Sequence, residues 1–563
     1  MKRLAALLLL LAVPLFAAPV TNEPVHAPHA VVASVSEIAS RVGAEVMKKG
    51  GNAIDATVAV AFALQVVWPE AGNIGGGGFL IYRTAAGKSE VIDYRERAPL
   101  AASRDMYLDA QGNVVKGLST VGAKAVGVPG TVAGLVLAHK KWGKLKWASL
   151  VEPARKLAAG GFVVSEFLDR RLNTPENVER LSKFPESRRI YLRGGAGLKA
   201  GETFVQPDLA KTLARIQKNP SDFYKGVTAR MMIDEVKAAG GILTMQDLAE
   251  YAPAIRTPIT GTYRGYEIIT MPPPSSGGVT LLQMLNMLET RDVAAPGHNS
   301  IAELHLLLEV ERRAYADRAR WLGDADFVKV PTKGLLDKHY AAAHIAGFDP
   351  EHATPSASEG AGDPLPYESP QTTHFSIVDQ EGNAVTNTYT LNDSFGSGVT
   401  VHGAGFLLND EMDDFTSKPG VPNGYGLVQG EANAIAPRKR PLSSMTPTIV
   451  LKDGKLFLVI GSPGGGMIIN TVLQVIVNVI DYGMNLQQAI NVPRFHHQWL
   501  PDEVFYEFGN LPEALRAGLV GMGYHIRPKP EDIGDAHGVM VDPKTGERLG
   551  ASDWRRGGKP AGF

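Results

Sequence analysis

The chain has 563 residues, of which 44% are hydrophobic and 20% are charged, proportions typical of a globular protein with a buried core. Its formal net charge of −1 gives no basic signal for nucleic acid, so we expect no nucleic-acid partner. The sequence contains no cysteine, which excludes disulfides, thiolate zinc sites and a cysteine nucleophile.

Residues 1–18 have the pattern of a secretory signal peptide. A basic MKR precedes the apolar run LAALLLLLAVPLF, and small residues near Ala18 suit cleavage. The apolar run is too short to span a membrane, and Pro14 interrupts it, which disfavours a buried first helix. Because no other apolar run has spanning length, we expect an exported protein, periplasmic or secreted, without a membrane span.

The first two thirds of the chain indicate mainly helices. The stretch 37–84 predicts two helices joined by a Gly-Gly turn, then the glycine-rich loop GNIGGGG and a strand. Residues 100–270 indicate helices and loops, and TYRGYEIITMPPPSSGG predicts one strand that ends in a Pro-Ser-Gly turn before a helix. Residues 301–322 are apolar at helical spacing, which predicts an amphipathic helix.

The pattern changes after residues 347–371, which are rich in Pro, Gly, Ser and Glu and predict a flexible, exposed linker. TTHFSIV and AVTNTYTL around a DQEGN turn predict one hairpin, and TPTIVL and KLFLVIGS around KDG predict a second. Residues 467–483 are apolar nearly all round and predict a buried helix. Alternating strands with buried helices indicate a sheet layered with helices.

Two threonines, Thr372 and Thr373, open the first of these strands directly after the linker. A threonine hydroxyl can use its own α-amino group as a base, since that amine has a pKa of about 7.7–8.0. The amine exists only if the bond after Gln371 is cut, so one hypothesis is self-cleavage: Thr372 Oγ1 attacks the Gln371 carbonyl, an N→O shift gives an ester, and water releases it. The alternative is that both threonines are plain strand residues, which from the residues alone is the commoner outcome.

The turn GSPGGG, residues 461–466, joins a predicted strand to the start of the buried helix. Unpaired backbone N–H groups at such a place can bind an oxyanion. Gly464 and Gly465 would let the backbone approach a substrate closely. A tight turn without a ligand explains the same residues equally well.

Further polar clusters suggest a charged ligand. Arginine suits a carboxylate because its donors form a fork, and hydroxyls add donors, which makes candidates of Arg95, Ser443 and Ser444. NDEMDDF gathers Glu411, Asp413 and Asp414, which could hold an amino group or form a solvated turn. No nucleotide-binding, EF-hand or H-E-x-x-H pattern is present, and His496–His497 and the pair His305/Glu309 suit structural roles, so we expect no metal and no cofactor.

Taken in order, eleven segments resemble the γ-glutamyltransferase (γ-glutamyl transpeptidase) family: GNIGGGGF, YRERAP, PPPSSGG, ESPQTTHFSIVD, NTYTLNDSFGSG, LLNDEMDDF, KPGVPNGYGL, RPLSSMTPTIV, GSPGGG, NVPRFHHQWLPDE and GASDWR. They run over nearly the whole chain after the signal peptide. QTTH followed by DDF, PLSSM and GSPGG is the most specific part of this resemblance.

The resemblance implies an α+β fold of the N-terminal-nucleophile hydrolase type, an αββα sandwich with two antiparallel sheets between helical layers. It implies cleavage between Gln371 and Thr372 into a large subunit, residues 19–371, and a small subunit, residues 372–563, which stay intertwined as a heterodimer. By motif, the resemblance implies a nucleophile, Thr372; a threonine that hydrogen-bonds it, Thr390; oxyanion glycines, Gly464 and Gly465; an α-carboxylate clamp, Arg95, Ser443 and Ser444; an α-amine clamp, Asn392, Glu411 and Asp414; and a lid, with Tyr425.

The implied activity is hydrolysis or transfer of the γ-glutamyl group of glutathione and related compounds, with water or an amino acid or peptide as acceptor. Two alternatives remain: a cephalosporin-acylase-like amidase, which would not need Glu411 and Asp414, and an uncleaved exported binding protein. The chain departs from the familiar pattern at Gly466 and Met467, where many members continue GSPGG with Ser-Arg, and at Arg97, where Met is familiar.

Overall fold

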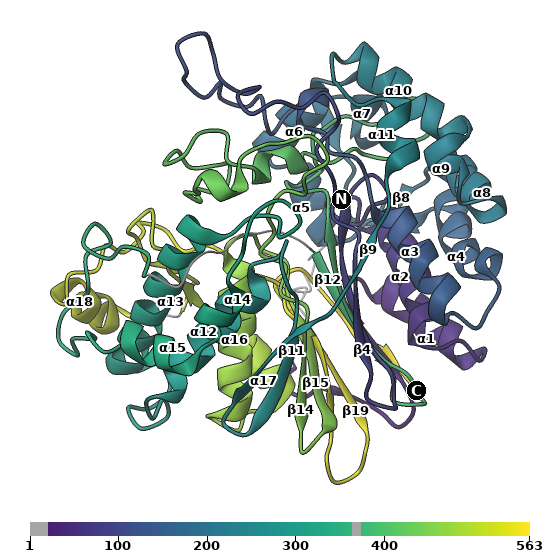
Figure 1. Cartoon of the computed structure of the whole chain (residues 1–563). Helices are drawn as coiled ribbons and strands as arrows, with labels where there is room; N and C mark the ends of the chain where they lie inside the picture. The colour runs from purple at the N-terminus through teal and green to yellow at the C-terminus, as the bar shows by residue number, and fades with distance from the viewer. Residues whose placement is uncertain (1–20, 363–372, 510) are drawn as a thin grey trace, which may run out of the picture.

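The computed structural model describes residues 21–362, 373–509 and 511–563, and two seven-stranded sheets lie between helical layers (Figure 1). The first sheet has the order β20 (Ala561–Gly562), β2 (Val31–Ser34), β12 (Thr373–Val378), β13 (Ala384–Thr390), β3 (Gly77–Arg83), β4 (Ser89–Asp93), β9 (Ala254–Arg256). The second has the order β1 (Val25–Ala27), β19 (Arg548–Ser552), β18 (His537–Val541), β15 (Lys455–Gly461), β14 (Thr448–Lys452), β11 (Tyr266–Thr270), β10 (Ile259–Tyr263). The pairs in both sheets are antiparallel.

The strands are apolar on both faces because each sheet packs against the other sheet and against helices. Val31 and Ala33 of β2 belong to the core between the sheets, whereas Val32 faces the helical layer. Ile449 and Val459 of the second sheet meet Val31 in the same inner core. This double burial explains why the strands carry continuous apolar runs.

Each outer layer contains at least one helix that is buried almost all round. The layer on the first sheet contains α1 (Glu37–Lys48), the buried α2 (Ala53–Val67), α3 (Thr131–Trp142), α4 (Trp147–Gly160), α5 (Glu166–Leu172), α6 (Pro175–Ser182), α7 (Pro185–Tyr191), α8 (Pro207–Lys218), α9 (Asp222–Lys225), α10 (Val227–Ala238) and α11 (Met245–Glu250). The layer on the second contains the buried α12 (Gly277–Glu289), α13 (Ile301–Trp321), α14 (Thr332–Leu335), α15 (Lys338–His344), the similarly buried α16 (Met467–Ile480), α17 (Leu486–Asn491) and α18 (Glu513–Gly521).

The parts of the chain before and after residue 372 share one core. β12 and β13 lie between β2 and β3, which come from the first hundred residues. Within the described ranges, no helix is both long enough and apolar enough to cross a membrane. The predicted signal peptide and the residues Gln371 and Thr372 lie outside the described ranges.

The structure differs from the sequence-based prediction at two places. TYRGYEIIT forms the hairpin β10–β11 instead of one strand, with φ of 50° at Arg264 and 83° at Gly265 in the turn. Such a turn needs positive φ at both central residues and is usually signalled by Asn-Gly, which is absent here. In the predicted linker, residues 354–362 contact α13 and the loop 497–502, and Ser356 is only 2% exposed, although Pro355, Ala357, Ser358 and Gly360 are exposed as expected.

Candidate active site

The start of β12 meets the end of β15 where the two sheets face each other. β12 begins at Thr373, which follows Thr372 in the chain. Gly461, the last residue of β15, packs on the ring of His374, and a Cβ atom there would lie 2.4 Å from the ring Nδ1. Burial lowers the pKa of His374 well below its ordinary value, so this ring is neutral in the core. The close contact sets the first residues of β12 beside the GSPGGG turn.

Thr390 ends β13 and is buried. Its Oγ1 accepts a hydrogen bond from the Asn392 backbone N–H at 2.9 Å. Asn392 has φ of 83°, a conformation that asparagine tolerates better than most residues, and its Nδ2 donates to the Asp410 carbonyl at 3.1 Å. Thr390 is thus connected through Asn392 to the acidic turn that follows Asp410.

The GSPGGG turn presents two glycines ahead of α16. Gly464 and Gly465 have φ of 129° and 66°, and their N–H groups donate no hydrogen bond to any residue that the structure describes. The loop is held by Ser462, whose Oγ accepts from the Asp535 N–H at 2.9 Å. A rigid pair of donors beside a helix N-terminus is the arrangement that stabilises an oxyanion.

Arg95 follows β4 and lies in a fully buried cluster of charges. It forms ion pairs with Glu411 and Asp414, which lie on the 3₁₀ turn Glu411–Asp414, and both carboxylates are also fully buried. The Arg95 Nε donates to the Pro441 carbonyl at 3.1 Å, and one terminal nitrogen donates to the Leu442 carbonyl at 2.8 Å. Residues from three distant segments of the sequence therefore meet at one guanidinium group.

Carboxyl groups outnumber guanidinium groups in this cluster. Glu96 is also buried, with its carboxyl oxygen 3.6 Å from the Arg95 guanidinium, so three carboxyl groups surround one cation. Burial raises the pKa of Glu411 and of Asp414, and Arg95 acts in the opposite direction. Burial and then Glu411 raise the pKa of Glu96 well above its ordinary value. The cluster would gain from a bound cation such as an ammonium group.

Several polar atoms in the cluster have no hydrogen-bond partner among the described residues, although they are buried. Three are acceptors on the predicted amine clamp: Asn392 Oδ1, Glu411 Oε2 and Asp414 Oδ1. The Ser444 hydroxyl of the predicted carboxylate clamp and both carboxyl oxygens of Glu96 also have no partner among the described residues. Buried polar groups are normally paired, so this set indicates a place for a polar ligand.

The two serines of RPLSSM have different environments. Ser443 Oγ accepts from the Met445 N–H at 3.2 Å, and the Ser443 carbonyl accepts from the Ser276 N–H at 2.9 Å. The second bond, with that from the Ser443 N–H to the Pro274 carbonyl at 3.1 Å, joins RPLSSM to the PPPSSGG segment, which therefore supports the cluster. The Ser444 hydroxyl is left available for a ligand.

Tyr425 lies on the segment 418–430, which covers the acidic turn. Gly424 N–H donates to Asp413 Oδ2 at 2.9 Å, and Ser119 Oγ donates to Asp413 Oδ1 at 2.6 Å. Asp413 therefore ties this segment to the rest of the protein, while its neighbour Asp414 faces Arg95. Burial and then Asp393 raise the pKa of Tyr425 well above its ordinary value.

Two departures from the family pattern, Arg97 and Gly466, have local explanations, and nothing in the structure explains Met467. Arg97 lies over the ring of Tyr251 at 5.5 Å, and the Tyr251 hydroxyl donates to the Arg95 carbonyl at 2.8 Å. Gly466 has little room, since a Cβ atom would lie 3.0 Å from Gln498 Oε1. Glu96 was missed as a cluster member, and its only sequence signal is its place in YRERAP.

The chain was compared with known proteins. The family model Gamma-glutamyltranspeptidase matches residues 39–563. The chain is 50% identical to the glutathione hydrolase proenzyme of Escherichia coli (strain K12), over 94% of this chain and 91% of that protein. It is 38% identical to the acylase ACY 1 proenzyme of Pseudomonas sp. (strain SE83), over 96% and 94%. A crystal structure of cephalosporin acylase from Bacillus halodurans superposes with a TM-score of 0.87 over 99% of both chains, at 26% identity.

The two facing sheets, the helical layers and the buried charged site define an enzyme with the N-terminal-nucleophile hydrolase fold. The chain belongs to the γ-glutamyltranspeptidase family. The predictions of fold class, family and γ-glutamyltransferase or glutathione hydrolase activity are thus confirmed. The roles of the individual site residues remain predictions.

Proposed function

We propose that the chain is an exported precursor that cleaves itself between Gln371 and Thr372. The products are a large subunit, residues 19–371, and a small subunit, residues 372–563, held together by the common core. The mature enzyme removes γ-glutamyl groups from donors such as glutathione and passes them to water or to an amino acid or peptide.

The observation that carries this proposal is the buried cluster around Arg95. A γ-glutamyl group ends in an α-ammonium and an α-carboxylate, both remote from the scissile amide. The carboxylate takes the guanidinium of Arg95 and the hydroxyl of Ser444, and the ammonium takes the acceptors of Asn392, Glu411 and Asp414. An α-linked glutamyl residue has no free α-carboxylate, so it would leave Arg95 without that partner.

The proposed reaction uses the α-amino group of Thr372 as the base and the GSPGGG turn as the oxyanion-binding group. The α-amino group of Thr372 takes the proton from its own hydroxyl, and the oxygen attacks the γ-carbonyl carbon. The N–H groups of Gly464 and Gly465 hold the resulting oxyanion. The C–N bond breaks, the amine leaves with the proton, and the γ-glutamyl ester remains on Thr372. Water or an acceptor amine then attacks the ester by the same steps and regenerates the hydroxyl.

A test compares two isomeric substrates on purified protein. We expect release of the leaving amine from a γ-glutamyl anilide and little release from the α-glutamyl isomer, with a Thr372→Ala variant inactive on both. Equal rates on the two isomers would contradict the assigned clamp, and full activity in the variant would contradict the nucleophile.

An acylase activity on substrates without an α-amino group is the second candidate. It is favoured by the likeness to an acylase proenzyme and to a cephalosporin acylase structure. It is opposed by the surplus of buried carboxyls at Glu96, Glu411 and Asp414, which suits an ammonium. Higher kcat/KM on a glutaryl amide than on the matched γ-glutamyl amide would favour the acylase.

The segment 418–430 forms the lid in this proposal. With Tyr425 it covers the bound donor and limits the access of water. Its tether to Asp413 sets where the segment lies. A Tyr425→Ala variant with an unchanged ratio of hydrolysis to transfer would contradict this role.

A further inference from the structure

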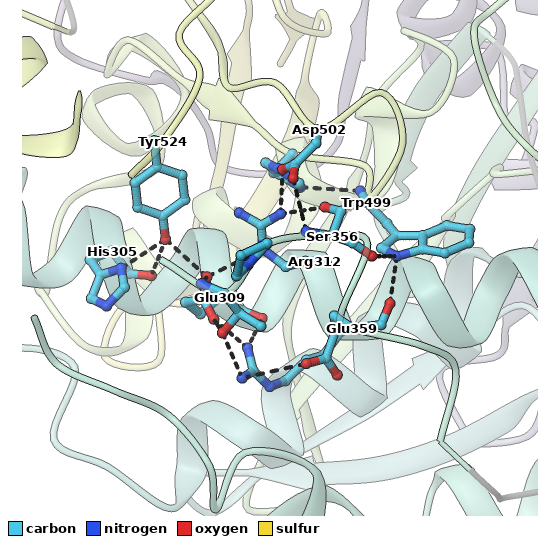
Figure 2. A network of polar contacts seen from close by, with 12 residues as sticks. His305, Glu309, Arg312, Ser356, Glu359, Trp499, Asp502 and Tyr524 are labelled. Atoms are coloured by element: carbon cyan, nitrogen blue, oxygen red, sulfur yellow. Dashed lines mark hydrogen bonds and ion pairs between the residues drawn. The ribbon is translucent and has the colours of Figure 1, made fainter. Parts of the chain in front are cut away.

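Residues 354–362, which we call the strap, lead toward the proposed cleavage bond and are held by a dense polar network (Figure 2). At its centre the buried Arg312 of α13 donates to Ser356 Oγ and pairs with Asp502 of the loop 497–502. Asp502 in turn accepts from the Ser356 N–H at 2.8 Å. Arg312, Ser356 and Asp502 thus form a closed three-way junction.

The strap is also tied to α13 at both of its ends. At the first end, Thr354 donates to Glu309 through its N–H at 3.1 Å and its hydroxyl at 2.6 Å. At the second end, the Gly362 N–H donates to Asp317 at 2.7 Å, and Trp321 Nε1 donates to the Gly362 carbonyl at 3.1 Å. The strap therefore runs along one helix with fixed ends.

The loop 497–502 holds the middle of the strap. Trp499 Nε1 donates to the carbonyls of Ser356 at 3.1 Å and Glu359 at 2.8 Å. His497 Nε2 lies 3.2 Å from Asp502 Oδ1 and fixes that carboxylate from the other side. Strap and α13 belong to the proposed large subunit, whereas this loop belongs to the proposed small subunit.

The network is stronger than a surface contact. Arg312 is 1% exposed and also pairs with Glu309, which is fully buried. The charges in the network are balanced. Asp502 pairs with Arg312, and Glu309 pairs with the neighbouring Arg313. Removing one partner of such a buried group leaves the others unsatisfied, so the junction resists detachment.

We propose that Arg312, Ser356 and Asp502 are positioning residues for self-cleavage: they anchor the chain upstream of the bond between Gln371 and Thr372. This inference rests on the proposed function, and it adds a device that acts on maturation and leaves turnover of the donor unchanged. None of the three residues belongs to the cluster around Arg95.

The physical reason is the short length of chain between the strap and the bond. Ten residues, 363–372, separate Gly362 from the start of β12. Opening the junction leaves the strap held by its ends and by Trp499, so the direction in which the chain leaves Gly362 is fixed less tightly. Orientation of the reacting groups governs the rate of an intramolecular attack, so a smaller share of chains places the Gln371 carbonyl correctly.

The experiment follows conversion of precursor to fragments by pulse-chase in expressing cells, with four variants beside wild type. Asp502→Asn and Ser356→Ala open the junction, and Ser356→Thr keeps a hydroxyl. Glu503→Gln is the matched control, since Glu503 neighbours Asp502 and pairs only with the partly exposed Arg527 among the described residues. The processed fraction of each variant is then assayed for the KM of a γ-glutamyl donor.

We expect conversion to slow threefold or more in Asp502→Asn and Ser356→Ala, to stay near wild type in Ser356→Thr and Glu503→Gln, and the donor KM to stay within twofold throughout. Wild-type conversion rates in both opening variants would overturn the inference, as would a slowing that only matches a loss of folded precursor. If Asp502→Asn does not fold, Ser356→Ala decides. A wild type that never converts would instead overturn the proposed function itself.

Discussion

Arg95 and Asp414 form an ion pair in which both side chains are fully buried, although 319 residues separate them in the sequence. Such a pair is costly to desolvate and is weak evidence for stability. It is better explained as a preorganised binding group, because Asp414 Oδ1 still lacks a partner among the described residues. In the proposed function, the same pair holds the two opposite charges of one ligand.

Replacing Arg95 by lysine tests the carboxylate side of the cluster. A lysine cannot form the fork of donors and leaves buried acceptors unsatisfied. We therefore expect a loss of about 3 kcal/mol in transition-state stabilisation, which lowers kcat/KM for a γ-glutamyl donor by roughly two orders of magnitude. Arg97→Met is the control in the same segment, and we expect a change below about threefold because Arg97 lies on the Tyr251 ring. Steady-state kinetics measure both, and equal losses would contradict the assignment.

Replacing Asp414 by asparagine tests the amine side. The variant keeps the shape and removes a charge that pairs with an ammonium, so we expect kcat/KM for a γ-glutamyl amide to fall about 100-fold. The matched glutaryl amide lacks the amine, and its kcat/KM should change by less than about threefold. The informative quantity is the ratio of the two substrates, and a parallel fall of both would show only general damage.

Gly464→Ala tests the oxyanion turn. Gly464 has φ of 129°, where only glycine is unstrained, and an added Cβ would lie 3.0 Å from the Gly534 backbone. The turn must shift, so we expect kcat to fall about 100-fold with little change in KM. Gly483→Ala, at φ of 64° with open space around it, also places an alanine at positive φ, with less strain and far from the site, and should keep kcat. Loss of kcat in both variants would point to strain alone.

The contribution of His496 and His497 to the stability of the folded chain should fall as the pH drops below about 6.5. The buried carboxyls of Glu303 and Asp413, with pKa values raised to about 7 and about 6, contribute in the opposite direction. Burial lowers the pKa of His496 to about 3 and that of His497 to about 4, so both stay neutral when folded. The unfolded chain binds their protons near pH 6.5, which favours unfolding by about 1.4 kcal/mol per pH unit for each histidine. This stabilising contribution is complete above pH 6.5 and is lost as the pH falls toward 4.

Urea unfolding of the mature enzyme between pH 7 and 5 measures the change in the free energy of unfolding per pH unit. His497→Gln should remove the contribution of His497 to this slope, independently of any change in stability at pH 7. His352→Gln changes an exposed histidine and should leave the slope as it is. If the slope is the same in His497→Gln as in the wild type, groups other than His497 govern the pH dependence.

Much of the fold was predictable because its signals are local. Helices α13 and α16 and the hairpins around β12 and β14 follow from spacing, turns and apolar runs. The hairpin at Arg264 was missed because its turn lacks the usual residues. The strap was predicted as linker because its composition is polar, whereas its attachment depends on Arg312 and Asp502, which are distant in the sequence.

The candidate site was predictable mainly through the family resemblance. Arg95, Glu411 and Asp414 were each ordinary charged residues by pattern alone, and only the fold brings them together. Asp413 was grouped with them, yet its side chain faces Ser119 and Gly424. Alternation along a short 3₁₀ turn could not be inferred from the sequence.

Self-cleavage at Thr372 is the central claim, and intact mass with N-terminal sequencing of purified protein tests it most directly. We predict two fragments in the wild type, the smaller one beginning Thr-Thr-His-Phe, and a single chain in Thr372→Ala. A folded wild-type chain that stays in one piece would lack the free threonine amine, and would contradict the mechanism at its first step.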